Sequence, residues 1–413
     1  MSTINLKTIP TEWRHSLMDD YITNGVIELT RGNVISKKDI QNNPGNNPIY
    51  SSSIHGGALF GKYNPYMFDE ELITWSVDGG GNFFYRPKHK FSVTNVSGIL
   101  RILKKDRLIY KYLFYLLDWE HSFFKFDYQD KAHPSVIRKM YNILEPSLFE
   151  QEKIVEVLSS IDDEIKKIDE IIFKTIKLKT GLMTHLFAKG IGHKKFKKTK
   201  IGGIPMSWDV GGFNNIVDPK NKNAIKPGPF GSALKKSFYV EKGFKIYGQE
   251  QVISGDITYG DYYIDEEKYK DLEGFKVNAG DILISLVGTI GKVLVISESF
   301  EKGIINPRLL KITVDRKKAD PQFIAYLLKS DFLIQQMNQK SHGGTMNILN
   351  KGMLMGVNFG IPPLDEQKEI TKIISAVDEK ISINIKHKEA LIKLKKGLMQ
   401  DLLSGKVRTK ASK

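Results

Sequence analysis

The sequence contains no cysteine and no long apolar run. The missing cysteine excludes a disulfide framework and any thiolate metal site. No run of 18 apolar residues occurs, and the opening MSTINLKTIPTEW lacks the apolar core of a signal peptide. We therefore expect a soluble cytoplasmic protein with no membrane partner.

Acidic residues are the minority of the charged residues: the 413-residue sequence has 62 Lys and Arg but only 47 Asp and Glu. The net charge of +15 favours a polyanionic partner, most often nucleic acid. The alternative is a basic surface that only keeps the protein in solution. The length and the hydrophobic share of 41% predict two or more globular domains with real cores.

One segment occurs twice at a constant offset of 216 residues, from Pro146 to Pro362. The shared register holds over about forty residues, which indicates a duplication. The first half of the match pairs Pro146, Leu148, Glu150, Gln151, Ile154, Ser159, Asp162 and Ile165 with Pro362, Leu364, Glu366, Gln367, Ile370, Ser375, Asp378 and Ile381.

Both copies have the pattern of a long helix with a coiled-coil seam. Apolar residues step by four and three, which is the spacing of such a seam. They are Ile154, Leu158, Ile161, Ile165, Ile168 and Ile172 in the first copy and Ile370, Ile374, Val377 and Ile381 in the second. Asn384 falls where Ile168 sits, and two interpretations stay open. Either the Asn fixes the register, or the seam has moved onto Ile385.

Charge changes sign along each copy. The first begins with acidic residues and then carries nine lysines and no acid from Lys174 to Lys200. Acid first and base last suits each helix dipole and favours antiparallel pairing of the two helices. Such a pair would form a spacer of roughly 60 Å. The alternative is two unrelated surface helices, each capping its own domain.

The segments before the two helices also correspond, more loosely. Ile9-Pro10-Thr11-Glu12-Trp13 matches Ile204-Pro205-Met206-Ser207-Trp208, and ELITWSVDGGGNFFY parallels GDILISLVGTIGKVLVI. We predict two mixed α/β heads rich in short strands, with Trp75 and Trp208 in core or domain-entry positions. The expected order is head 1–144, helix 145–188, basic linker 189–203, head 204–360, helix 361–404 and basic tail 405–413.

This order, the PPLDEQKEI helix start and the GDILISLVGTIGKV stretch resemble the specificity subunit of type I restriction-modification systems. The resemblance covers nearly the whole chain. In the first copy Ser147 replaces the second proline of the helix start and Phe149 replaces the acidic residue. The resemblance implies an α+β fold. In it, two mixed α/β target recognition domains are separated by two long antiparallel coiled-coil helices with an internal pseudo-two-fold.

The resemblance also implies a non-catalytic DNA reader. Each head would recognise one part of an asymmetric split site in double-stranded DNA, and the helices would set the gap. Two methyltransferase subunits, which bind S-adenosylmethionine and methylate adenine, would be recruited, and translocating restriction subunits would cut DNA using ATP and Mg. No cofactor is expected in this chain itself.

Physical reasoning also favours two separated DNA contacts. Antiparallel helices related by a pseudo-two-fold match the dyad of duplex DNA, whose turn spans roughly 34 Å. Arg, Lys, Asn and Gln read base edges, while phosphate contacts position the protein. Loops of mixed polar, aromatic and basic content supply the predicted DNA-binding residues. They are Ser51, Ser52, Ser53, His55, Lys62, Tyr63, Asn82, Tyr85, Arg86 and Lys88 in the first head and Lys235, Lys236, Gln249, Gln251, Thr289, Lys292, Arg308, His342 and Thr345 in the second.

The sequence matches known catalytic motifs only in part. LVGTIGKV has Leu286 at the first glycine position of a phosphate loop and Val293 at the Ser/Thr position. Asp320-Pro321-Gln322-Phe323 only partly matches a methyltransferase loop and fits a helix start better. The histidines show no metal-ligand spacing. Two rival functions are kept, a self-contained DNA methyltransferase or nuclease and a coiled-coil scaffold without DNA specificity.

Overall fold

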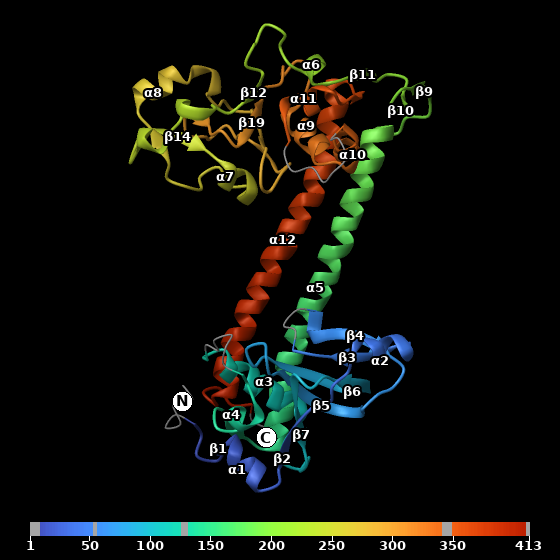
Figure 1. The fold of residues 1–413 in the computed structure, drawn as a ribbon, viewed down its shortest axis with the longest axis vertical. Coiled ribbons are helices and arrows are strands. Elements are labelled where there is room, and N and C mark those ends of the chain that lie inside the picture. Colours follow the sequence, from blue (N-terminus) through green and yellow to red (C-terminus); the bar gives the residue numbers. More distant parts are fainter. Residues whose placement is uncertain (1–8, 53–55, 125–130, 341–348, 410–413) are drawn as a thin grey trace. The chain divides into compact units, whose positions relative to one another are not determined.

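The structure is a computed structural model that describes residues 9–52, 56–124, 131–340 and 349–409 (Figure 1). It divides into two compact units. Unit 1 comprises Met1–Glu170 with Ile385–Lys413, and unit 2 comprises Ile171–Asn384. Each unit thus combines one head with parts of both long helices. No helix in the described part of the chain is long and apolar enough to cross a membrane.

The two long helices are α5 (Leu148–Lys189) and α12 (Leu364–Leu403). Each follows proline, which cannot donate a hydrogen bond and so loses little at a helix start. Each is followed by a glycine with positive φ, Gly190 at +63° and Gly405 at +72°. This left-handed conformation ends a helix and is open to glycine without strain. The repeated helix predicted from the sequence is therefore present in both copies.

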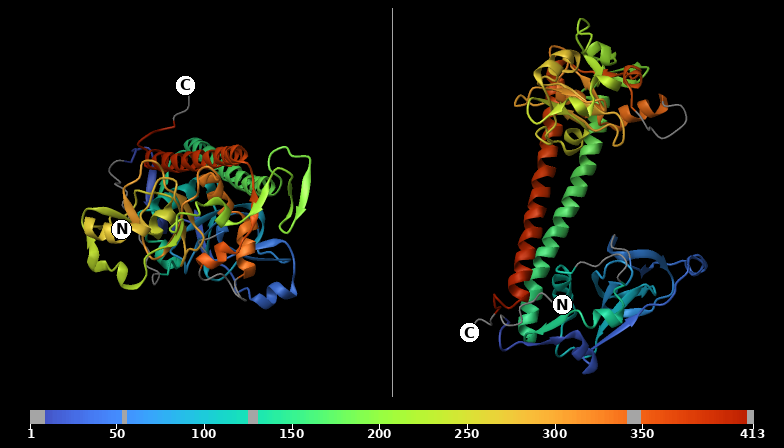
Figure 2. Two further views of the ribbon diagram at one scale, coloured as in Figure 1. Left: turned by 90° about the horizontal axis from the view of Figure 1, so that it is seen from above. Right: turned by 60° about the vertical axis from the view of Figure 1, so that its left-hand side comes forward.

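The two helices run antiparallel within each unit and lie side by side in Figure 1 and in the right-hand view of Figure 2. In unit 1, Lys395 pairs with Asp162 at 2.6 Å and Lys388 pairs with Asp169 at 2.6 Å. As the residue number rises along α5 it falls along α12, which defines the direction. The acidic start of one helix meets the basic end of the other, as the charge pattern predicted.

The seam residues lie inward. Ile154, Leu158, Ile161 and Ile168 are buried on α5, as are Ile370 and Ile374 on α12. Asn384 is half-buried and its Nδ2 donates to Lys380 O at 2.8 Å, within its own helix. Ile385 is 42% exposed. Of the two interpretations of this region, the seam has thus not moved onto Ile385.

The head of unit 1 is built on a six-stranded sheet with strand order β2-β7-β5-β6-β3-β4, antiparallel except for the β3–β6 pair. Its core includes Trp75, whose Nε1 donates to Ala132 O at 2.8 Å, and residues of both long helices. The elements are β1 (Arg14–Leu17), α1 (Met18–Thr23), β2 (Ile27–Arg31), α2 (Lys37–Asn42), β3 (Asn47–Tyr50), β4 (Leu59–Tyr63), β5 (Phe68–Ser76), β6 (Phe83–Val93), β7 (Ser97–Ile102), α3 (Tyr110–His121), α4 (Pro134–Ile137) and β8 (Asn142–Glu145), which pairs with β1.

The head of unit 2 has two four-stranded sheets, ordered β12-β19-β16-β17 and β13-β15-β14-β18. Fully buried Trp208 anchors its core. The elements are β11 (Asp209–Gly211), α6 (Phe213–Ile216), β12 (Ile225–Pro227), β13 (Tyr239–Val240), β14 (Phe244–Tyr247), α7 (Gln249–Ser254), β15 (Tyr263–Ile264), α8 (Glu266–Asp271), β16 (Ile282–Ser285), β17 (Val293–Val295), β18 (Gly303–Ile305), β19 (Leu309–Ile312), α9 (Pro321–Leu328), α10 (Asp331–Lys340), α11 (Lys351–Met355) and β20 (Phe359–Ile361), which pairs with β11.

The segment expected to be a basic linker contains a small hairpin. Strands β9 (Phe196–Thr199) and β10 (Gly202–Pro205) pair antiparallel. The lysines of this segment do not show the apolar alternation by which a strand is recognised. Backbone pairing forms this hairpin, and Thr199 Oγ1 closes its turn by donating to Gly202 O at 2.7 Å.

Candidate nucleic-acid interface

Three loops of unit 1, those that follow β3, β5 and β6, meet at one place. The N–H of Thr94 donates to Tyr50 O at 2.9 Å and joins the β6 loop to the β3 loop. The N–H of Val77 donates to Val96 O at 2.9 Å and joins the β5 loop to the β6 loop. Backbone bonds of this kind fix the course of a loop whatever its side chains are.

Three loops of unit 2, those that follow β14, β16 and β18, meet in the same way. The N–H of Asn306 donates to Tyr247 O at 2.8 Å, as Thr94 does to Tyr50. The N–H of Leu286 donates to Arg308 O at 2.9 Å, as Val77 does to Val96. The two heads therefore share a set of backbone bonds that we call the loop frame.

Three further pairs of bonds complete the loop frame and correspond one to one. In unit 1 they run from Ser76 N to Asn82 O (3.0 Å), from Ala132 N to Val77 O (2.9 Å) and from Gly32 N to Ser97 O (3.2 Å), and in unit 2 from Ser285 N to Lys292 O (3.0 Å), from Leu349 N to Leu286 O (3.0 Å) and from Gly228 N to Leu309 O (2.9 Å). This correspondence assigns to each bonded residue of one head an equivalent residue in the other.

The side chains on the two frames differ at corresponding places. Counting from the bonded residues, Asn82 corresponds to Lys292, Ser52 to Gln249 and Val96 to Arg308. Unit 1 thus has a neutral amide, a hydroxyl and an aliphatic group at the positions where unit 2 has a lysine, an amide and an arginine. One scaffold with two sets of polar groups can recognise two different patterns of donors and acceptors.

The structure brings together part of the predicted residues of unit 1. Ser51, Ser52, Asn82 and Arg86 lie on or against the loop frame. The others have different surroundings. Lys62 on β4 and Lys88 on β6 are exposed, Tyr63 is buried with its hydroxyl 2.6 Å from Ser92 Oγ, Tyr85 donates to Glu71 at 2.6 Å, and Ser53 and His55 lie outside the described residues.

Four predicted residues of unit 2 lie on the loop frame. Gln249 donates to Val287 O, while Thr289, Lys292 and Arg308 are exposed. The others have different surroundings. Lys235 and Lys236 are exposed on the segment after β12, Gln251 is buried and binds Gly248 N at 2.8 Å and Tyr259 O at 2.5 Å, and His342 and Thr345 lie outside the described residues.

Arg86 supports the frame from inside unit 1. Its Nε donates to Thr74 Oγ1 at 3.1 Å and its Nη1 to Gly57 O at 3.0 Å, while its guanidinium lies 3.6 Å above the Tyr50 ring. Burial lowers the pKa of Arg86 to about 10, so the group stays charged at neutral pH. Arg86 thus holds the loop after β3 in place.

Lys292 and Arg308 are two exposed cations on the loop frame of unit 2. Exposed cations create a positive potential that attracts an anion. The loop frame of unit 2 is therefore positively charged at these two positions.

A family of known proteins matches this chain once in each copy of the repeat. The description "Type I restriction modification DNA specificity domain" matches residues 18–174 and again 230–394, one match for each unit of the repeat. The chain belongs to this family. Each match takes in one head and part of the long helix that follows it, so the family unit is the repeat itself.

Two curated relatives of this specificity family come from Methanocaldococcus jannaschii. The type I restriction enzyme MjaVIII specificity subunit is 29% identical over 82% of this chain and 79% of its own length. The putative type I restriction enzyme MjaX specificity subunit is 31% identical over 79% of this chain and 75% of its own length. Each alignment thus covers most of this chain and most of the relative, so it extends into both heads.

Solved structures show the same fold. A type I restriction-modification S subunit from M. genitalium superposes with a TM-score of 0.56 at 16% identity, over 97% of this chain and 98% of that one. A chain from a study of the assembly and conformational transition of the type I R-M system gives 0.57 at 14% identity, over 97% and 99%. The specificity fold, with its mixed heads and long helices, is thereby confirmed.

Each specificity domain is joined to the long helices by a buried glutamine. Gln151 accepts from Ile109 N at 2.9 Å and donates to Arg107 O at 2.8 Å and Pro146 O at 3.0 Å. Its repeat partner makes the same three bonds in unit 2. There Gln367 accepts from Asp320 N at 3.0 Å and donates to Lys318 O and Pro362 O, both at 2.9 Å.

A tyrosine, an aspartate and a lysine form a second repeated contact in each specificity domain. In unit 1, Tyr115 donates to Asp162 at 2.7 Å and Asp162 pairs with Lys395 at 2.6 Å. Burial and the bond to Asp162 raise the pKa of Tyr115, so it stays protonated and donating. In unit 2, Tyr326 donates to Asp378 at 2.9 Å and Asp378 pairs with Lys179 at 2.6 Å.

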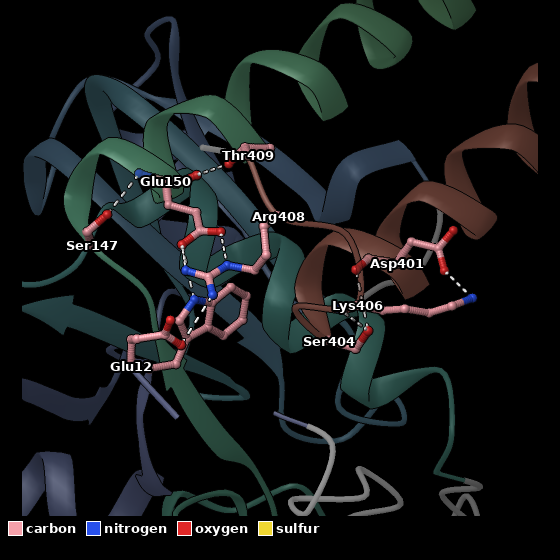
Figure 3. A network of polar contacts seen from close by, with 9 residues as sticks. Glu12, Ser147, Glu150, Asp401, Ser404, Lys406, Arg408 and Thr409 are labelled. Carbon is pink, nitrogen blue, oxygen red and sulfur yellow. Dashed lines mark hydrogen bonds and ion pairs between the residues drawn. The ribbon is translucent and has the colours of Figure 1, made fainter. Parts of the chain in front are cut away.

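The third repeated contact holds the segment that follows each long helix (Figure 3). Trp13 Nε1 donates to Glu150 at 3.0 Å, and Arg408 grips the same carboxylate with Nε at 2.7 Å and Nη2 at 2.9 Å. Figure 3 shows the Arg408 guanidinium between Glu12 and Glu150. In unit 2, Trp208 donates to Glu366 at 2.9 Å, and His193 Nε2 lies 2.8 Å from the same carboxylate.

Arg408 should contribute clearly to the stability of unit 1. The Glu150 side chain is only 6% exposed. Arg408→Ala leaves this carboxylate buried with Trp13 as its remaining side-chain donor among the described residues, so we expect a loss of about 2–3 kcal/mol in the free energy of unfolding. Urea unfolding of the full chain measures it.

Lys406 offers a matched control on the same segment. It pairs with Asp401 at 3.0 Å, but its side chain is 75% exposed. Lys406→Ala should change the free energy of unfolding by no more than about 0.5 kcal/mol. Equal effects of the two alanine substitutions would contradict the role given to Arg408.

Sequence reasoning missed most of these joint contacts. Glu150 and Gln151 were visible as repeated residues, but they were interpreted only as a helix start. Trp13 was noted only for its match to Trp208. Arg408 gave no signal, because its partner lies 258 residues earlier in the chain.

Proposed function

We propose that this chain is the DNA specificity subunit of a type I restriction-modification complex and reads an asymmetric split site in duplex DNA. Each head recognises one half-site through its loop frame. The observation that carries this proposal is the shared frame with different side chains. Its common backbone suits one mode of docking, and its different polar groups suit two different base sequences.

Charge supports duplex DNA as the ligand. The chain carries a net charge of +15, and the exposed side chains of Lys292 and Arg308 lie on the loop frame of unit 2. Lysines that neutralise phosphates release counterions, so binding should weaken steeply as salt rises. A coiled-coil scaffold without DNA specificity would bind its partners with little dependence on salt.

The repeat also suits recruitment of other subunits. We propose that the helices set the gap between the half-sites and that two methyltransferase subunits dock on the chain, one for each unit, with restriction subunits joining them. S-adenosylmethionine, ATP and Mg would then belong to those subunits. Within the described residues, no three His, Asp or Glu side chains are grouped as a metal site.

Selection from a random duplex library tests the proposal. The full chain with its partner subunits should enrich two short sequences separated by a fixed gap. Exchanging residues 201–360 for the matching head of the MjaX relative should alter one half of the enriched site and leave the other unchanged, because each frame is closed within its own head. No enrichment, or a change in both halves, would refute modular recognition.

The rival enzyme function is tested with the same protein. A self-contained methyltransferase or nuclease would modify or cut the selected duplex without partner subunits. The specificity subunit proposed here should bind that duplex and leave it chemically unchanged. Turnover by the purified chain alone would favour the rival.

A further inference from the structure

Val34 and Phe230 are the two most exposed large apolar side chains in the described part of the chain, at 76% and 71%. A single exposed apolar residue is normal and needs no special explanation. Two of them at corresponding places in a duplicated fold do need one, because chance exposure would not follow the repeat. Both lie in loops of the heads and outside the long helices.

The loop frame shows that the two positions correspond. Gly32 donates to Ser97 O and Gly228 donates to Leu309 O, which are equivalent bonds of the frame. Val34 stands two residues after the first glycine and Phe230 two residues after the second. Each head therefore presents one apolar tip at the same point of its loop frame.

Both glycines are needed for close packing against the frame. A Cβ at Gly32 would collide with Val93 O and Thr94 O, and a Cβ at Gly228 would collide with Asn306 O. These are backbone atoms, which cannot move aside as a flexible side chain can. The apolar tips are thus held next to the loops whose side chains differ between the heads.

A pair of lysines follows each tip. Lys37 and Lys38 come three and four residues after Val34, and Lys235 and Lys236 come five and six residues after Phe230. All four lysines are exposed. An exposed apolar group followed within six residues by two exposed cations is suited to a ligand that has both apolar surface and regularly spaced negative charge.

We propose that Val34 and Phe230 are apolar contacts to DNA bases, each flanked by a lysine pair on the phosphates. The proposal rests on the DNA-reading function given above and adds a recognition device to it. Apolar side chains contact thymine methyl groups in the major groove or wedge between base steps, and lysines contact phosphates. Valine and phenylalanine differ in size and shape, so the device itself distinguishes the two half-sites.

The tips and the lysines should respond differently to salt. Phe230→Ala should weaken binding of the full chain to its selected duplex about tenfold, because contact of an aromatic ring with a base is worth that much. The dependence of binding on salt should stay the same, since no charge is lost. Lys235→Gln combined with Lys236→Gln should instead lower the salt slope by about 2, with the base preference retained.

The two tips should act on different half-sites. Renewed selection with Phe230→Ala should relax the preference in one half-site, and selection with Val34→Ala should relax the other. Ile383→Ala is the matched control, since Ile383 on α12 is 59% exposed but lies outside the head loops. It should change neither affinity nor preference. Because all three side chains are exposed, the variants should unfold at the same temperature as the wild type.

The outcomes separate this inference from the proposed function. A wild-type chain that enriches no sequence would overturn both. A wild-type split site with unchanged affinity and preference for Phe230→Ala would overturn the apolar contact alone. Phe230→Ala that keeps DNA binding but loses a partner subunit would identify the tip as a protein-docking residue and would also overturn it.

Discussion

Replacing Gln367 by leucine should lower the free energy of unfolding of unit 2 by about 3–5 kcal/mol. The side chain is fully buried and satisfies one backbone N–H and two backbone carbonyls. Leucine fills a similar volume but leaves all three groups without partners, and each buried orphan costs roughly 1–3 kcal/mol. Gln151→Leu should have the same effect in unit 1, because the three bonds repeat there.

Hydrogen exchange on the full chain reports the two units separately. The Asp320 amide should lose protection in Gln367→Leu, and the Ile109 amide should lose it in Gln151→Leu. Gln336→Leu is the control in unit 2. The Gln336 side chain also makes two bonds to the backbone, because it donates to Asn358 O and accepts from Asn358 N, but it is only half-buried. Water can replace its bonds, so a loss as large as that of Gln367→Leu would refute the account.

Replacing Gly228 by alanine should abolish recognition of one half-site. A Cβ there would collide with backbone atoms of Asn306 and Pro307, so the two loops must separate. Overpacking of this kind costs about 1–3 kcal/mol or more. It would also strain the bond from Gly228 N to Leu309 O, which belongs to the loop frame. We expect the selected duplex to bind at least about tenfold more weakly, because a displaced frame loses several base contacts of about 1–3 kcal/mol each.

Two further glycines make this prediction specific. Gly203→Ala in the same unit meets nothing within 4 Å and should leave binding unchanged. Gly32→Ala collides with the backbone at the equivalent place in unit 1 and should damage the other half-site. Retention of both half-sites by Gly228→Ala would show that the loop frame does not position the DNA-reading side chains.

The sequence predicted the parts of this fold that repeat or have a period. The offset of 216 residues between the copies and the step of four and three residues identified the long helices. The change of charge sign along them indicated their direction, which the pair of Asp162 with Lys395 confirms. Such features are local or self-similar, so one chain is enough to reveal them.

Long-range contacts account for what was missed. The loop frame joins residues that are far apart in the chain, such as Thr94 and Tyr50, through backbone atoms, which any residue carries. Gly32 and Gly228 are positions of the frame where the residue type does matter. Tyr63 and Gln251 have the composition of a DNA-contacting residue but are buried. Burial in a loop depends on which other loops cover it, and the sequence does not record that. The contacts of the exposed candidates with DNA stay a prediction.

The bonds of the loop frame run between main-chain atoms, so most substitutions of exposed loop side chains during evolution do not remove them. Mutations of exposed polar side chains on the loops, such as Lys292 and Arg308, leave those bonds intact, so under the proposed function new targets are accessible without refolding of the head. Because each frame is closed within its own unit, one half of the target can drift while the other is preserved. Under the proposed function, a lineage with this architecture can therefore acquire new DNA targets one half-site at a time.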